Sequence, residues 1–137
     1  AILPEERYLD EVIRKVNDLY TGQFTEADNM LVKNIMDIIM KDDEVRRSAK
    51  ANNEDMFVQS VFPKVFSEKT SKAYKESASS YKKLFESKEF YNAIMKSIGN
   101  VIYRILNSED TIKYSETNED NSNTELKVAE DSEEYNN

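Results

Sequence analysis

Glycine and proline are almost absent from this chain, and their scarcity is the strongest constraint on its fold. The 137 residues contain two of each. An all-β domain reverses direction every few residues and draws on glycine and proline to do so, whereas a helical protein needs few of either. Hydrophobic residues make up 39% of the chain and charged residues 34%, a mixture typical of amphipathic helices. The sequence therefore predicts an all-α protein.

Apolar residues recur at the helical spacing of three and four in successive segments, which are separated by breaks near positions 22, 42, 63 and 87. We expect residues 1–106 to form one helical domain, a compact bundle of about five amphipathic helices. Its stripes are Leu9, Val12, Ile13, Val16, Leu19 and Tyr20; Leu31, Ile35, Ile38 and Ile39; Met56, Phe57 and Val61; Tyr74, Ala78, Tyr81 and Phe85 from about Ser67; and Phe90, Ile94, Ile98, Val101 and Ile105.

The first two helices meet at a glycine followed by a capping signal. Gly22 is expected to end the first helix by entering the left-handed region, which glycine adopts without a Cβ clash. Thr25 and Asp28 have the spacing of a capping box, in which the hydroxyl and the carboxylate each bond the other residue's backbone N–H. The sequence therefore predicts a tight helix-to-helix turn.

The later breaks rest on caps and on the second proline. Asp42, followed by two more acids, resembles a metal or nuclease site, but a helix N-cap with first-turn acids explains it better, because neither a histidine nor a nearby lysine completes a catalytic set. Pro63 is expected to end or kink a helix, and Ser87 to cap the last one. Gly99 lies inside that last helix, where glycine is about 1 kcal/mol less favourable than alanine. Close contact with another helix would explain why a glycine is found there despite this cost.

Charge is unevenly distributed along the chain. Residues 107–137 hold ten acids and two bases and so account for the whole net charge of −8. Their Asn, Ser, Thr and acidic composition predicts an acidic, mostly irregular tail, since such a segment cannot bury enough apolar surface to order itself. Up to Asp55 the balance is −5, and from Lys64 to Arg104 it is +5. The folded part therefore has an acidic half and a basic half.

Several classes of chemistry are excluded by residue type. The chain has no cysteine and no histidine, so thiolate metal sites, disulfides and the usual general base at neutral pH are absent. Two glycines cannot build a phosphate-binding loop. No apolar run reaches the roughly 20 residues that a membrane helix needs, and no signal-peptide pattern begins the chain. We expect a cytoplasmic protein, or a piece of one, that is non-catalytic by itself and needs no metal or cofactor.

Two sets of side chains are candidates for binding. Basic residues could neutralise DNA phosphates without reading bases, although an ordinary solvated face explains them equally well; they are Arg46, Arg47, Lys50, Lys64, Lys69, Lys72, Lys75, Lys82 and Lys83. Of these, Lys72, Lys75, Lys82 and Lys83 are expected to share one helix with two tyrosines. Aromatic residues could anchor a protein partner, although most helical aromatics fill the core; the candidates are Phe57, Phe66, Phe90 and Tyr91.

Three stretches carry a resemblance to a known family. LDEVIRKVNDLYTGQFTEAD, AKANNEDMFVQSVFPKVF and SYKKLFESKEFYNAIMKSIGNVIYRIL resemble, in this order, the C-terminal region of the motor subunit of type I restriction endonucleases, in particular of the IC subfamily. The similarity spans about residues 8–106 and includes the step Ala51-Asn52-Asn53-Glu54, which adds Asn52, Asn53 and Glu54 to the interaction candidates. Pro63 and the acidic tail depart from the family's pattern.

The resemblance implies a fragment of a large ATP-dependent DNA translocase and endonuclease. Its nuclease and ATPase domains, with their ATP and Mg²⁺, would lie elsewhere in the parent chain. This part would hold the motor to the methyltransferase and specificity subunits, and its basic half could contact duplex DNA. An independent helical protein-interaction module unrelated to restriction is the alternative, since a helical pattern does not specify function.

Overall fold

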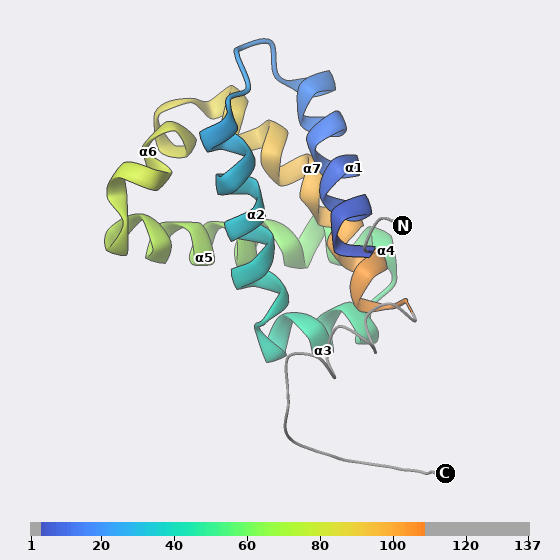
Figure 1. The fold of residues 1–137 in the computed structure, drawn as a ribbon. Helices are drawn as coiled ribbons and strands as arrows, with labels where there is room; N and C mark the ends of the chain where they lie inside the picture. The colour runs from blue at the N-terminus through green and yellow to red at the C-terminus, as the bar shows by residue number, and fades with distance from the viewer. Residues whose placement is uncertain (1–3, 109–137) are drawn as a thin grey trace. The chain divides into compact units, whose positions relative to one another are not determined.

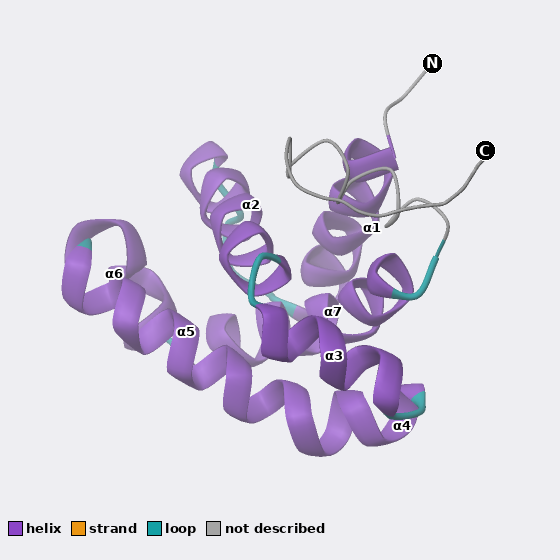
Figure 2. Cartoon of the chain, turned by 90° about the horizontal axis from the view of Figure 1, so that it is seen from below, coloured by secondary structure: helices purple, strands orange, loops and turns teal. Residues whose placement is uncertain are grey.

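Every regular element in residues 4–108, the part of the chain that the computed structural model describes, is a helix (Figures 1 and 2). The all-α prediction is confirmed. The elements are α1 (Pro4–Leu19), α2 (Glu26–Met40), α3 (Asp43–Ala51), α4 (Glu54–Met56), the π-helix η1 (Phe57–Val61), α5 (Phe62–Glu76), α6 (Ala78–Glu86) and α7 (Lys88–Leu106). Because α4, η1 and α5 follow without a break, these residues form six helical stretches where about five were predicted. Apart from Asn107 and Ser108, the predicted acidic tail lies outside the described residues.

Helix α7 forms the centre of the bundle. It contacts α1, α2, α3, η1, α5 and α6, and it buries residues on most of its circumference, among them Phe90, Ile94, Ile98 and Ile102. A helix that is apolar over most of its circumference is expected to be buried on those sides. The helix ends at Leu106, where the sequence analysis placed the end of the helical domain.

Helices α1 and α7 lie side by side and run in opposite directions (Figure 1). Two polar contacts fix this register: Lys15 Nζ donates to Asn100 Oδ1 at 3.0 Å, and Arg104 pairs with Glu11 one turn away. Burial raises the pKa of Glu11, but Arg104 and Lys15 outweigh that effect and hold the pKa below its usual value. The pairs therefore align the charged edge of α1 with α7, while Val12 and Val16 enter the core.

The three predicted helix caps are confirmed. Thr25 Oγ1 accepts the N–H of Asp28 at 3.2 Å, and the N–H of Thr25 donates to Asp28 Oδ2 at 2.9 Å, which completes the capping box of α2. Asp42 caps α3 through the N–H of Val45, and Ser87 caps α7. The acids at positions 42–44 are therefore a helix start, as the sequence analysis preferred.

The explanation given for Gly22 was wrong. Its backbone does not enter the left-handed region; a Cβ added here would lie 2.4 Å from the hydroxyl oxygen of Tyr20. The Tyr20 ring folds over the glycine and packs against Phe90, with the ring centroids 5.0 Å apart. Gly22 therefore leaves space that the ring of Tyr20 occupies.

Pro63 was predicted to end or kink a helix; it does not end the helical run, but the helix type changes just before it. The helical run continues from Glu54 to Glu76, but residues Phe57–Val61 form a π-helix, and the N–H of Phe62 donates to the carbonyl of Phe57. Pro63 lies in the first turn of α5, where its missing N–H costs little. The wider turn also brings Phe57 and Phe62, five residues apart, onto one face, since a π-helix closes i→i+5. Their rings lie 6.1 Å apart.

The fourth predicted helix is divided. It was expected to run from about Ser67 past Tyr81, but α5 begins at Phe62 and ends at Glu76, and α6 turns back beside it after the cap residue Ser77. A continuous helix would separate residues 74 and 85 by about 16 Å along its axis, yet the rings of Tyr74 and Phe85 lie 4.9 Å apart. The predicted stripe of four residues therefore does not exist: only Tyr81 is buried, while Tyr74, Ala78 and Phe85 are exposed.

Gly99 provides the close contact that was expected of it. A Cβ here would lie 3.2 Å from the ring of Phe62, which is itself fully buried. The glycine therefore lets the start of α5 approach α7 closely. None of the helices in residues 4–108 combines the length and the hydropathy required to cross a membrane.

Candidate functional site

Three of the four predicted aromatic anchors lie in the core. Phe57, Phe66 and Phe90 are each 0% exposed, so they cannot meet a partner, and the core role that was weighed beside the anchor role is the correct one. The fourth, Tyr91, is half-buried and packs edge-on against Phe66 at 5.0 Å. Burial therefore removes three candidates and leaves Tyr91.

Tyr91 leads to an aromatic surface that the sequence did not predict. The ring of Phe85 lies 5.9 Å from Tyr91 and 4.9 Å from Tyr74. Tyr74 is 38% exposed and Phe85 40%. We call Tyr74, Phe85 and Tyr91 the aromatic platform. Three helices contribute to it, and its inner edge rests on the core through Phe66, so the rings are held in place before any partner arrives.

Lys83 is held inside the fold. Its Nζ pairs with Asp28 Oδ2 at 2.6 Å, donates to the carbonyl of Gln23 at 2.8 Å, and lies 4.6 Å from the ring centroid of Phe90. The Asp28 side chain is only 6% exposed, and a buried carboxylate needs such a partner. Lys83 therefore ties α6 to the start of α2 and is not free to bind phosphate.

Lys69 and Lys50 also make structural contacts. Lys69 pairs with Asp42, the N-cap of α3, and this hydrogen bond holds the pKa of the Asp42 carboxyl below its usual value. Lys50 Nζ donates to the carbonyl of Leu106 at 3.1 Å, where a cation is favoured by the negative end of the α7 dipole. Both lysines link one helix to the end of another.

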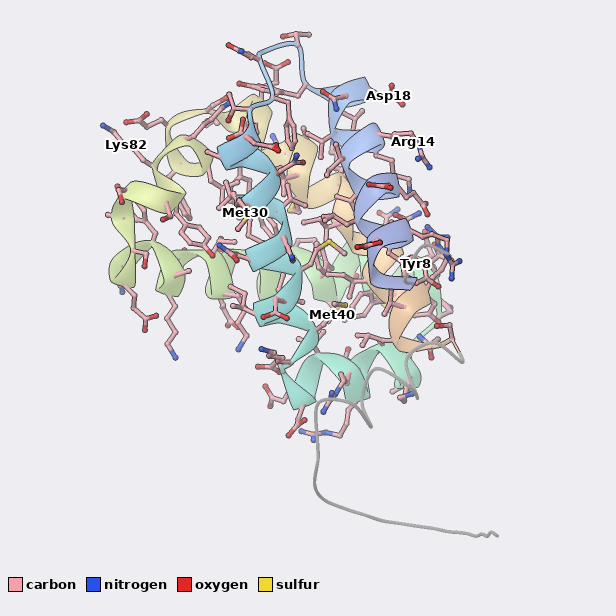
Figure 3. The ribbon with its side chains drawn as sticks, in the orientation of Figure 1. Tyr8, Arg14, Asp18, Met30, Met40 and Lys82 are labelled. Atoms are coloured by element: carbon pink, nitrogen blue, oxygen red, sulfur yellow. The ribbon has the colours of Figure 1, made fainter. Side chains whose placement is uncertain are left out.

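Two further basic candidates are paired at the surface and one is not. Arg46 contacts Asp43 at 2.8 Å within α3, and Lys82 lies 3.8 Å from Glu86 within α6. Figure 3 shows Lys82 at the outer side of α6. Arg47 is exposed. Exposed pairs of this kind contribute little to stability, so these residues stay available to solvent.

Lys64, Lys72 and Lys75 are the basic candidates that share one surface. All three are exposed, and at 3.6 residues per turn they fall within about 80° of one another on α5. Phe62, Phe66 and Thr70 are buried on the opposite side of this helix. We call the three lysines the α5 basic face. Lys82 and Lys83 were expected on the same helix and instead belong to α6.

The Asn52-Asn53-Glu54 step shapes the chain between α3 and α4. Asn53 caps α4 by accepting the N–H of Met56 at 2.8 Å, and the carbonyl of Asn52 accepts the hydroxyl of Tyr103 at 2.7 Å. Both asparagines therefore have structural roles. Glu54 is exposed in the first turn of α4 and faces a groove.

This groove lies between the end of α1, the α4–η1 turn and the middle of α7, and has a volume of about 620 Å³. Its apolar residues are Leu19, which is 50% exposed, and Val58 of the π-helix. Charged and polar side chains supply the rest: Lys15, Asp18, Glu54, Asp55, Lys96, Ser97 and Asn100. We call it the α1–α7 groove.

Neither surface has the features of a catalytic centre or a metal site. In residues 4–108, no group of three or more carboxylate, thiol or imidazole side chains is arranged to hold a metal ion. No protein-family model, curated protein or solved structure matches this chain. The structure offers two candidate binding surfaces, the aromatic platform and the α1–α7 groove, beside the α5 basic face.

The exposure of Tyr74 and Phe85 was not predicted from the sequence, and neither was the groove. Tyr74 and Phe85 have the spacing of a buried stripe only if the helix continues through Ser77. The run Ser77-Ala78-Ser79-Ser80 was the available signal, since serine favours helix ends over helix interiors. The exposure of Leu19 and Val58 could not be predicted from the sequence, because helix packing determines which apolar side chains stay at the surface.

Proposed function

We propose that this chain is a non-catalytic assembly domain, which docks the subunit that contains it onto a protein partner. The observation that carries the proposal is the aromatic platform. Isolated apolar residues are common at protein surfaces, but a cluster of packed aromatic rings at the surface is characteristic of interaction sites. Tyrosine in particular is enriched among the residues that contribute most binding energy.

The build of the platform supports docking. Tyr74 and Phe85 come from two helices that fold back on each other, and Tyr91 connects them to the buried ring of Phe66. Rings that are already packed lose little conformational freedom on binding, so less of the gain from burial is cancelled. Lys82 and Lys88 lie nearby in sequence and are exposed, as the polar rim of an interface commonly is.

The resemblance to type I restriction motor subunits suggests the partner. In that setting the domain would hold an ATP-dependent translocase and endonuclease to its methyltransferase and specificity subunits, and the chemistry would reside in other domains of the parent chain. An all-helical domain with a preformed aromatic surface suits this role. It would suit an independent helical interaction module equally well, with a different partner.

Assembly can be tested in the parent motor subunit. The double variant Tyr74→Ala/Phe85→Ala should weaken binding to the co-expressed methyltransferase and specificity subunits at least about tenfold, since losing one strong anchor costs 1.4 kcal/mol or more. Met56→Ala is the matched control, because Met56 is 49% exposed and lies outside the platform. Affinity can be measured by interferometry, with circular dichroism to confirm folding.

Two outcomes would contradict the proposal. If the double variant binds both subunits with wild-type affinity, the platform is not the docking surface. If it binds weakly but Met56→Ala does so equally, the loss reflects general damage to the domain. Binding to an unrelated partner, with no affinity for methyltransferase or specificity subunits, would favour the independent module.

A second candidate function is contact with duplex DNA through the α5 basic face. Lys64, Lys72 and Lys75 make no ion pair among the described residues and project to the solvent side of one helix. Their span of about 16 Å, from 11 residues at 1.5 Å each, covers several phosphates. Glu68 lies among them, and its negative charge reduces the attraction.

DNA contact predicts a specific salt dependence. Changing Lys64, Lys72 and Lys75 to Ala should reduce the slope of log K against log salt by up to about 3, since each neutralised phosphate contributes about 0.9. The triple change of Lys33, Lys88 and Lys96 to Ala removes the same charge from other helices. Equal slopes for the two triple variants would show that only net charge matters and would exclude a dedicated DNA surface on α5.

A further inference from the structure

The α1–α7 groove combines a small apolar floor with an excess of unpaired negative charge. Leu19 and Val58 supply the floor, and both are left partly exposed by the helices around them. Leu19 is the last residue of α1, where the chain turns away toward Gly22. Val58 lies in the π-helix, a geometry that is frequent at functional sites. The π turn sends Phe57 into the core and leaves its neighbour at the groove.

The groove has three carboxylates and two lysines, but only one of these lysines is available to neutralise them. Lys15 is already paired with Glu11 at 3.4 Å and donates to Asn100. Lys96 is then the only lysine of the groove without a partner among residues 4–108, and it faces three acids. Of these, Asp55 accepts a hydrogen bond from Gln59 at 3.3 Å, whereas Asp18 points outward at the end of α1 (Figure 3) and Glu54 is exposed.

The lining favours a peptide over a small molecule. Small-molecule pockets are lined mainly by apolar and aromatic side chains, whereas this groove has seven polar or charged residues and two aliphatic ones. A small apolar centre with a charged rim is the anatomy of a protein interface. Because its unpaired charge is negative, complementarity selects a basic partner.

We propose that the α1–α7 groove binds a basic amphipathic helix of a partner protein, with one or two leucine-sized side chains on Leu19 and Val58 and lysine or arginine side chains toward Asp18, Glu54 and Asp55. This proposal rests on the proposed function as an assembly domain, and it adds a second surface whose partner has a stated chemistry. The aromatic platform is formed by other helices, so the two surfaces can be disabled separately.

The test uses the whole 137-residue chain and two labelled helical peptides. One carries leucine at i, i+3, i+4 and i+7 with arginine elsewhere, and the other has glutamate in place of arginine. Fluorescence anisotropy at 150 mM NaCl should detect binding of the arginine peptide and no binding of the glutamate peptide. The variant Asp18→Asn/Glu54→Gln/Asp55→Asn should weaken the arginine peptide at least tenfold, and Leu19→Ala should weaken it severalfold.

The matched control separates the groove from the overall acidity of the chain. Glu44→Gln/Glu68→Gln/Glu76→Gln removes three exposed carboxylates that lie outside the groove, and it should change the affinity less than twofold. Equal losses for the two triple variants would show nonspecific attraction and would overturn the proposal, as would binding of both peptides alike.

The same experiment distinguishes this proposal from the proposed function. The platform variant Tyr74→Ala/Phe85→Ala should bind the arginine peptide as the wild type does. The groove variant, assayed in the parent motor subunit, should keep its platform-dependent affinity for the methyltransferase and specificity subunits. Loss of peptide binding in the platform variant would contradict the assignment to the groove.

Discussion

The aromatic residues of the α4–η1–α5 run and those of the α5–α6 hairpin form two regions with opposite fates. Phe57, Phe62 and Phe66 are buried completely, whereas Tyr74 and Phe85 keep about two fifths of their surface in solvent. The two regions share one continuous chain of ring contacts, which passes from Phe66 through Tyr91 to Phe85. The inner rings therefore stabilise the core, and the outer rings pack against it at the surface.

Changes and breaks in the helices determine which aromatic residues are buried. The inner rings share a face because a π-helix changes the register just before Pro63. The outer rings meet because the chain breaks at Ser77 and folds back. The spacing of apolar residues in the sequence reveals neither the π-helix nor the break at Ser77. The sequence therefore predicted a buried stripe that included Tyr74 and Phe85, and it offered Phe57 and Phe66 as surface anchors, whereas the structure exposes the first pair and buries the second.

The largest difference between the regions should be in stability. Phe66→Ala should lower the free energy of unfolding by about 3–5 kcal/mol, because it removes a fully buried ring and leaves a cavity. Tyr74→Ala should cost less than about 1 kcal/mol, since its ring is partly in water already. Urea unfolding followed by circular dichroism measures both. Similar losses for the two variants would remove the distinction.

The contact between the inner region and α7 gives a smaller effect. Gly99→Val should cost about 1–3 kcal/mol, because the new side chain meets the buried ring of Phe62 and extra atoms in a packed core force its side chains to shift. The same urea experiment applies, with Asn92→Val as a control at an exposed position of α7. A Gly99→Val protein as stable as this control would mean that α5 and α7 are less closely packed than described.

Helix content and three helix caps could be predicted from this sequence, because they depend on neighbouring residues. The capping box of Thr25 and Asp28 and the caps at Asp42 and Ser87 are local hydrogen bonds, and each was predicted correctly. The π-helix, the break at Ser77 and the role of Gly22 depend on rings far along the chain, such as Phe90 against Tyr20. Lys50, Lys69 and Lys83 were indistinguishable from free lysines for the same reason, since their partners lie at least 27 residues away.

The smallest of these effects concerns the link between α5 and α3. Asp42→Ala should cost about 1 kcal/mol by removing the N-cap, and Asp42→Asn should cost less, since asparagine still caps the helix and only the pairing with Lys69 is lost. Equal stability of the alanine variant and the wild type would show that the cap does not contribute.

The same carboxylate predicts a pH dependence. Its pKa is lower in the folded chain than the usual 3.8, so its stabilisation is present above about pH 4 and is lost as the pH falls through the folded value. Asp42→Asn should therefore reduce the loss of stability on acidification, as measured by urea unfolding between pH 2 and 7. If the variant loses as much stability at low pH as the wild type, that loss is due to other carboxyls, such as Glu11.

Hydroxyl-radical footprinting read by mass spectrometry tests the contrast between the two regions most directly. In the isolated chain, Tyr74 and Phe85 should be oxidised much faster than Phe57, Phe66 and Phe90. If the proposed function holds, Tyr74 and Phe85 should become protected when the methyltransferase and specificity subunits are added, while the buried rings stay unchanged. Equal oxidation of the inner and outer rings in the free chain, or no protection of Tyr74 and Phe85 in the complex, would contradict the account.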